Sequence, residues 1–139
     1  MKKTIISLIL LLVVATVSIS GCETKTANKT WGEKKISLDL ITISNNTTAD
    51  HYDWEGITYY YIDGYLLNKN PFDALNVKLK ATFYDSNGDI IATNETPYLE
   101  PKSIPLNGIS NFHFEVQDKN KDIVRYKVEL VDAQSEYSF

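Results

Sequence analysis

The chain has 139 residues, a net charge of −4 and a single cysteine, Cys22. This length is enough for one domain that buries its own core, and a single cysteine excludes an intrachain disulfide. The acidic balance argues against binding to nucleic acid and against electrostatic adhesion to anionic lipid.

The first 22 residues have the layout of a secretory signal peptide. Lys2 and Lys3 form a basic start, and an apolar run follows at 5–19. The run is shorter than the roughly 20 apolar residues of a membrane span, although an uncleaved transmembrane anchor is the alternative. The last four residues, Ile19-Ser20-Gly21-Cys22, resemble a lipobox, in which a peptidase cuts before the cysteine and the sulfur takes the lipid. We therefore predict an N-terminal lipoprotein signal peptide, 1–21, which is helical if uncleaved.

The segment 22–35 is polar and lacks apolar periodicity, which predicts a tether between a lipid on Cys22 and a domain at 36–139. Cysteines of this class carry a diacylglyceryl group, so the resemblance implies a stable anchor. Stable anchoring takes two chains or more, because each buried CH₂ contributes only about 0.8 kcal/mol. Cleavage would remove two lysines and no acid, which lowers the net charge from −4 to −6.

The rest of the chain is dominated by apolar residues at every second position and by strand-forming residues. This is the pattern of strands with one buried face, and no sustained helical spacing occurs. The predicted strands lie at 36–43, 57–67, 74–85, 89–93, 112–116 and 124–130.

Turn-forming residues separate these strands. In the segment 85–89, Gly88 supplies the positive φ of a type I turn with a bulge. The three prolines between 97 and 105 mark an irregular stretch or an edge strand, and 45–53 is a long polar insert. Six or seven short antiparallel strands predict an all-β, immunoglobulin-like sandwich of two sheets around one core.

A tyrosine stripe is the best candidate for a binding surface. Tyr59, Tyr61 and Tyr65 share one face of the predicted strand 57–67. Exposed aromatic rings can stack on sugars or anchor a protein partner. The alternative is that this face packs under 36–43 or under the polar insert. Three more aromatic residues are candidates to lie nearby: Tyr52, Trp54 and Tyr84.

The sequence contains no recognisable catalytic set. A hydrolase needs a nucleophile, a base and an orienting group, yet the chain has only two histidines, His51 and His113. We expect His113 on the outward face of its strand. His51 and Asp53 would be only two ligands, whereas zinc takes three or four, and a polar loop is the alternative. We therefore predict no enzyme activity, no cofactor and no metal site.

The sequence also contains two less specific motifs. Asp85, Asn87 and Asp89 resemble the start of a calcium loop, but the EF-hand glycine and glutamate positions do not match, and a hairpin turn accounts for them. The N-glycosylation acceptor pattern arises often by chance and matters only in a host with that pathway. It occurs at Asn28, Asn45, Asn46 and Asn94.

The pattern between residues 57 and 132 resembles the FxLYD-type domain. The similar positions are Ile62-x-Gly64-x-x-x-Asn68, Val77-x-Leu79-x-Ala81-x-Phe83-Tyr84-Asp85-x-x-Gly88-x-Ile90-Ile91, Pro105-x-x-Gly108 and Phe112-x-Phe114. That family comprises small extracytoplasmic β-sandwiches, frequent in prokaryotic lipoproteins, and it supplies no catalytic residues to carry over. The chain departs from it at Asn107-Gly108, where the family usually has Pro-Gly, and in the polar insert. The resemblance implies a fold and a location rather than an activity.

These observations predict a membrane-anchored, extracytoplasmic lipoprotein that acts as a non-catalytic binding or structural module. Its expected partners are the membrane, through the lipid on Cys22, and an envelope protein or polysaccharide, but not nucleic acid. The alternative is an accessory subunit of an envelope transport or adhesion complex. Exposure of the tyrosine stripe would favour a partner site on that face.

Overall fold

The computed structural model describes residues 36–135. The chain divides into two units, Met1–Trp31 and Gly32–Phe139, and the description covers part of the second. The signal peptide, Cys22, Asn28 and the tether therefore lie outside the described residues, and the expectations about them stay predictions. Within the described range, no helix is both long enough and apolar enough to cross a membrane.

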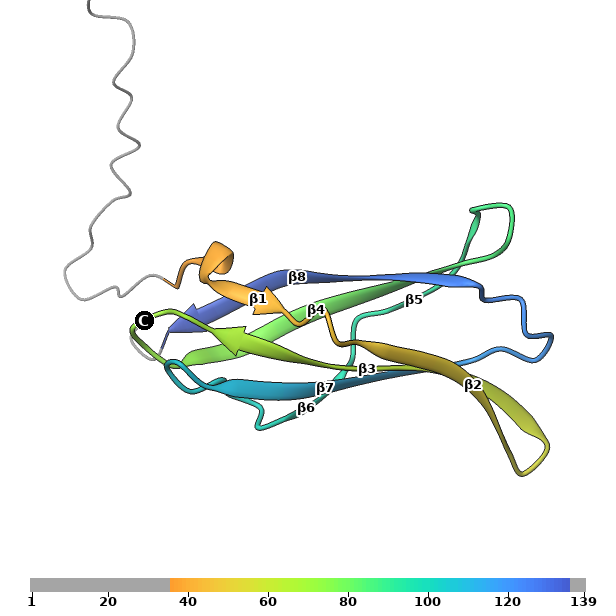
Figure 1. Ribbon diagram of the computed structural model, residues 1–139, viewed down its shortest axis with the longest axis horizontal. Coiled ribbons are helices and arrows are strands. Elements are labelled where there is room, and N and C mark those ends of the chain that lie inside the picture. The colour runs from red at the N-terminus through yellow and green to blue at the C-terminus, as the bar shows by residue number, and fades with distance from the viewer. Residues whose placement is uncertain (1–35, 136–139) are drawn as a thin grey trace, which may run out of the picture. The chain divides into compact units, whose positions relative to one another are not determined.

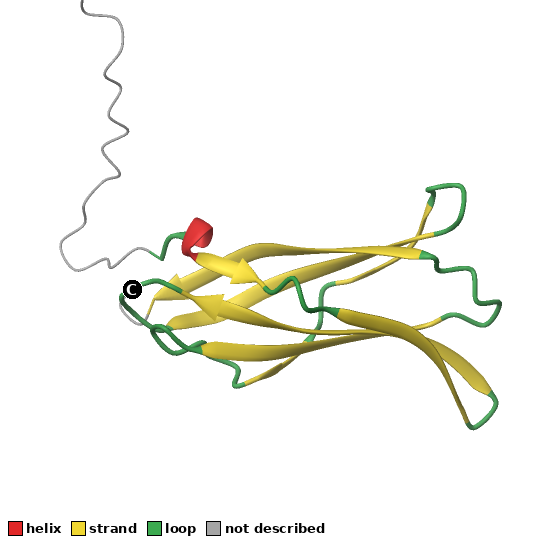
Figure 2. Cartoon of the chain, in the orientation of Figure 1, coloured by secondary structure: helices red, strands yellow, loops and turns green. Residues whose placement is uncertain are grey.

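The described domain is built from eight strands and one short 3-10 helix (Figure 2). The elements are η1 (Leu38–Leu40), β1 (Ile41–Ile43), β2 (Thr48–Trp54), β3 (Ile57–Asn68), β4 (Ala74–Tyr84), β5 (Ile90–Asn94), β6 (Tyr98–Glu100), β7 (Ile109–Gln117) and β8 (Arg125–Ser135).

The strands form two antiparallel sheets that face each other (Figure 1). The five-stranded sheet has the order β1-β3-β7-β6. The fifth strand, β2, lies on the same side of β3 as β1: β2 pairs with the first half of β3, and β1 pairs with its last residues. The three-stranded sheet has the order β5-β4-β8. This arrangement confirms the predicted all-β sandwich, with eight strands in place of six or seven.

The polar insert is not a loop, as the sequence suggested, but mostly a strand. Most of 45–53 belongs to β2, an edge strand whose side chains are half-buried or exposed on both faces. An edge strand on a sheet rim buries little, so it lacks the apolar alternation that reveals strands in a sequence. The two-residue turn after it places Glu55 at φ 51° and Gly56 at φ 79°, the pair of positive values typical of a tight hairpin.

Two other predicted segments, 36–43 and the proline-rich stretch, each contain a short strand. The segment 36–43 forms a strand only at Ile41–Ile43, because the 3-10 turn of η1 comes first. The proline-rich stretch contains an edge strand, β6, which pairs with β7. The turn at 85–89 forms as expected: Gly88 has φ 85°, and the Asp85 Oδ1 accepts the backbone N–H groups of Asn87 and Asp89, each at 2.9 Å.

The core lies between the two sheets and consists of the inward residues of alternate positions. Fully buried members include Ile62 and Leu66 on β3, Phe112 and Phe114 on β7, and Phe83 on β4. This packing also explains why residue 64 is a glycine. A Cβ there would lie 2.5 Å from the Phe112 ring and 2.8 Å from the Thr47 methyl, so only glycine fits without displacing them.

Two buried asparagines tie together one end of the sandwich. Asn68, at the end of β3, donates from Nδ2 to the carbonyl oxygens of Phe72 at 2.8 Å and Ile104 at 3.0 Å. Its Oδ1 accepts from the backbone N–H of Asn70 at 2.9 Å and from the Asn70 side chain at 3.0 Å. Asn70 in turn exchanges two hydrogen bonds with the backbone of Ser37. The amide cluster therefore joins the start of the domain to β3 and to the segment before β7.

We predict that Asn68→Ala lowers the free energy of unfolding by about 3 kcal/mol, because it leaves buried carbonyl and amide groups without partners. The measurement is urea denaturation followed by circular dichroism. The matched control is Asn111→Ala on the exposed side of β7, for which we expect a change within about 0.5 kcal/mol. Equal stability losses in the two variants would contradict the structural role of Asn68.

Candidate functional site

The outward face of the five-stranded sheet carries the predicted tyrosine stripe. Tyr59, Tyr61 and Tyr65 are half-buried there, while Tyr60 and the other inward residues of β3 belong to the core. The strands β1 and β2 do not pack over this face, although Asn45 and Asn46 of the polar insert line a pocket together with Tyr65. Both strands pair in the plane of the sheet, at the edge of β3, and so lie beside the stripe rather than over it.

Strand register extends this surface beyond β3. The pairing places Tyr52 of β2 opposite Tyr59, Glu115 of β7 opposite Tyr61, and His113 opposite both Asp63 and Tyr98. We call this surface the tyrosine face and define it by its eight central residues: Tyr52, Tyr59, Tyr61, Asp63, Tyr65, Tyr98, His113 and Glu115.

The rings on the tyrosine face support one another in two stacks. Tyr52 and Tyr59 lie 5.4 Å apart with an interplanar angle of 21°, and Tyr61 and His113 lie 6.3 Å apart at 15°. Tyr52 also contacts Tyr61 at 6.0 Å, which links the two stacks. Aromatic pairs of this kind are worth about 0.5–1.5 kcal/mol beyond their buried area, so the rings hold a defined arrangement before any partner binds.

Two carboxylates are held among these rings. The Tyr52 hydroxyl donates to Glu115, and this hydrogen bond, with burial and the Glu115 charge, raises the pKa of Tyr52 to about 12. His113 is on the outward face, as predicted. Its Nδ1 lies 2.7 Å from the Asp63 Oδ1, and its Nε2 lies 3.6 Å from the Glu115 Oε2. The surface therefore combines aromatic rings with ordered negative charge.

The three additional aromatic candidates separate in the structure. Tyr52 belongs to the tyrosine face. Trp54 continues the outward side of β2 to the tip of the hairpin, where it is 60% exposed. Tyr84 lies on β4 of the other sheet, where the Arg125 guanidinium sits 5.0 Å from its ring centroid, so it is not part of the face.

His51 has a different partner from the one that sequence proximity suggested. It lies on β2, not in a loop, and its Nε2 is 2.7 Å from the Asp118 Oδ2. Its ring packs edge-on against Tyr60 at 4.8 Å. Asp53 instead contacts Thr58 and Lys121. Among residues 36–135, no three His, Cys, Asp or Glu side chains form a group that could hold a metal ion.

Asp118 organises the loop between β7 and β8. Its carboxylate accepts the backbone N–H groups of Asp122 at 3.0 Å and Ile123 at 2.9 Å as well as the His51 contact. Burial raises the pKa of Asp118, but the hydrogen bonds from His51, Ile123 and Asp122 outweigh it and hold the pKa below its ordinary value. This pair leaves no signature in the sequence, because 67 residues separate its members. No local motif connects them.

The sequons within residues 36–135 differ in the exposure and hydrogen bonds of their asparagine side chains. Asn45 and Asn46 are exposed between β1 and β2. The Asn94 Nδ2 donates to the Glu115 carbonyl oxygen at 2.9 Å, and its Oδ1 accepts from the Thr96 backbone. A glycan on Asn94 would have to displace that contact with β7, so the exposed pair is more accessible.

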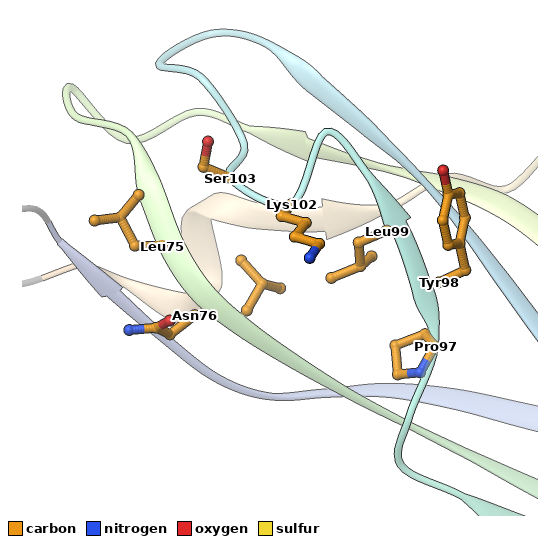
Figure 3. A pocket seen from close by; sticks show the side chains of 8 residues that line it. Leu75, Asn76, Pro97, Tyr98, Leu99, Lys102 and Ser103 are labelled. Atoms are coloured by element: carbon orange, nitrogen blue, oxygen red, sulfur yellow. The ribbon is translucent and has the colours of Figure 1, made fainter.

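A groove of about 510 Å³ lies between β4 and β6 on a different side of the sandwich (Figure 3). It exists because the chain leaves the three-stranded sheet after Asn94 and pairs with it again at Ile104, opposite Ala74. Leu75, Val77 and Leu99 are among its lining residues, with Lys102 at one side. Tyr98 of the tyrosine face also lines the groove, so the two surfaces meet at β6 (Figure 3).

Comparison with known proteins finds one similar crystal structure. No protein-family model and no curated protein sequence matches the chain. A crystal structure of a DUF1425 family member from Shewanella sp. pv-4 is similar, with 17% sequence identity and a TM-score of 0.40, over 73% of this chain and 96% of that chain. Similarity at this level assigns neither a family nor a function to the chain, and the resemblance to the FxLYD-type domain stays a prediction.

We predict that Asp118→Asn lowers the free energy of unfolding at pH 7 by about 1.5–3 kcal/mol, since it weakens hydrogen bonds to a charged acceptor. The pKa of Asp118 is lower in the folded state than its ordinary value of 3.8. Its stabilisation is therefore complete well above that pH and is lost as the pH falls through the folded-state pKa. Urea titrations at stepped pH should show that this acid-dependent component disappears in the variant. The control, Asp122→Asn at an exposed site in the same loop, should retain it.

Proposed function

We propose that the chain is an extracytoplasmic lipoprotein, anchored through Cys22, whose β-sandwich is a non-catalytic module that binds a partner through the tyrosine face. The observation that carries the proposal is the position of the stacked rings on the outward side of the five-stranded sheet, where no strand of residues 36–135 packs over them. Tyrosine supplies a large contact area at a low conformational cost, and this is why it is enriched where proteins bind one another.

The proposed location of the module rests on two features of the sequence. The lipobox-like Ile19-Ser20-Gly21-Cys22 supports export and lipidation, and the resemblance to FxLYD-type domains supports a place in a prokaryotic envelope. The proposal that the module is not an enzyme rests on the chemistry of its histidines. His51 is committed to the Asp118 loop, and His113 is stacked on Tyr61 between carboxylates, with no serine, threonine or cysteine among the eight residues that define the tyrosine face.

For the anchor, we predict that Cys22→Ser abolishes incorporation of labelled fatty acid and so removes the protein from the lipid-labelled membrane fraction. The sulfur is the attachment atom, and a serine hydroxyl does not replace it in this processing. The measurement is metabolic labelling followed by membrane fractionation. Labelling that persists in the variant would rule out lipidation at Cys22.

For the binding face, we predict that a photo-crosslinking residue at Tyr61 captures a defined partner in native membranes. The same residue at Tyr84, on the outward side of the other sheet, should not. Combined replacement of Tyr59, Tyr61 and Tyr65 by threonine should reduce the co-purified partner at least about tenfold, because buried aromatic anchors each contribute more than about 1 kcal/mol. Identical capture from both positions would show that the tyrosine face is not the binding surface.

A further inference from the structure

Charge is segregated between the two sheets. The strands of the five-stranded sheet, β1, β2, β3, β6 and β7, contain no lysine or arginine. They contain five carboxylates: Asp50, Asp53, Asp63, Glu100 and Glu115. The strands of the three-stranded sheet contain four basic residues, Lys78, Lys80, Arg125 and Lys127, and only two acidic ones, Glu129 and Asp132.

The basic residues of the three-stranded sheet already have partners within the chain. Lys127 pairs with Glu129 at 2.7 Å, and Lys78 with Asp132 at 3.8 Å. Lys80 pairs with Glu95 at 3.9 Å, and Arg125 lies over the Tyr84 ring. This sheet therefore largely neutralises its own charge.

The outward carboxylates of the five-stranded sheet have no such compensation. Within the part of the chain that is described, neither Asp63 nor Glu115 forms an ion pair with lysine or arginine; their partners are the His113 ring and the Tyr52 hydroxyl. Glu100 accepts from the Tyr98 hydroxyl in the same way. Negative charge thus remains on the surface that also carries the aromatic rings.

We infer that the tyrosine face binds a basic polypeptide segment of another protein, with arginine side chains as the main anchors; this inference rests on the proposed function. A guanidinium stacks on aromatic rings and forms paired hydrogen bonds to a carboxylate, and the face presents both groups side by side. A neutral or acidic partner would cover Asp63 and Glu115 without pairing them, and buried unpaired charge is costly.

Other occupants fit less well. A second copy of the chain would have to offer its three-stranded sheet, whose lysines are held in internal ion pairs and whose Arg125 lies over the Tyr84 ring. A neutral polysaccharide could stack on the same rings, but it offers no cation to Asp63 and Glu115. Acidic polymers would also be repelled by the carboxylates.

The test is a calorimetric titration of the full chain, purified in detergent, with the peptide nona-arginine. We expect saturable binding. Nona-citrulline has nearly the same shape without the charge and should bind at least about tenfold more weakly. Affinity for nona-arginine should also fall between ionic strengths of about 0.01 M and about 0.15 M, because exposed charges are screened over this range. Equal binding of the two peptides would overturn the inference.

Two double variants that remove the same charge locate the binding site. Asp63→Asn with Glu115→Gln alters the tyrosine face, and Glu129→Gln with Asp132→Asn alters the other sheet. We expect nona-arginine to bind the first variant at least about tenfold more weakly and the second less than about threefold more weakly. Equal weakening would mean general attraction to an acidic protein and would overturn the inference. Circular dichroism confirms that both variants fold.

Two further results separate this inference from the proposed function. If the crosslink from Tyr61 captures a partner that nona-arginine does not displace, the proposed function stands and the basic partner is ruled out. If sedimentation shows that the chain self-associates and that the variant at Asp63 and Glu115 abolishes this, the occupant is a second copy and the inference fails. Displacement of the captured partner by nona-arginine, and not by nona-citrulline, supports both.

Discussion

The register of β3 is the constraint on which the rest of the domain depends. This strand pairs with β1, β2 and β7, and its side chains alternate between the core and the tyrosine face. A slip of one residue would expose Ile62 and Leu66 and bury a row of tyrosines with Asp63 among them. Two local features prevent the slip. Only Gly64 can accept the Phe112 ring, and Asn68 must reach the buried carbonyl groups at the end of the sandwich.

This constraint also explains why the tyrosine face is so well defined. Packing of the core fixes which residues of β3 point inward, and the outward residues are then held at the spacing of the sheet. The pairing of β2 and β7 with β3 places Tyr52, His113 and Glu115 directly beside the outward residues of β3. A surface arranged by the core is rigid before it meets a partner, so little ordering is needed on binding.

Period-two alternation was enough to predict the sandwich and the inward and outward sides of β3, because burial imposes that pattern directly. The sequence contains little sign of β2, because the side chains of this edge strand are half-buried or exposed on both faces and lack apolar alternation. The one signal of β2 in the sequence is the hairpin itself, in which Tyr52 and Trp54 mirror Ile57 and Tyr59 around Glu55-Gly56. The pairing of His51 with Asp118, and the segregation of charge, depend on which strands become neighbours. Local pattern does not contain that information.

The amide cluster at Ser37, Asn68 and Asn70 has a mechanical consequence. A pull on the amino-terminal end of the domain is carried into the sandwich through the two hydrogen bonds between Ser37 and Asn70 and then through the short pairing of β1 with β3. A load applied to the tyrosine face enters the same strand, β3, from the other direction. Tension between an attachment point and a bound protein would thus pass along one strand, while the three-stranded sheet stays largely outside the path of the force.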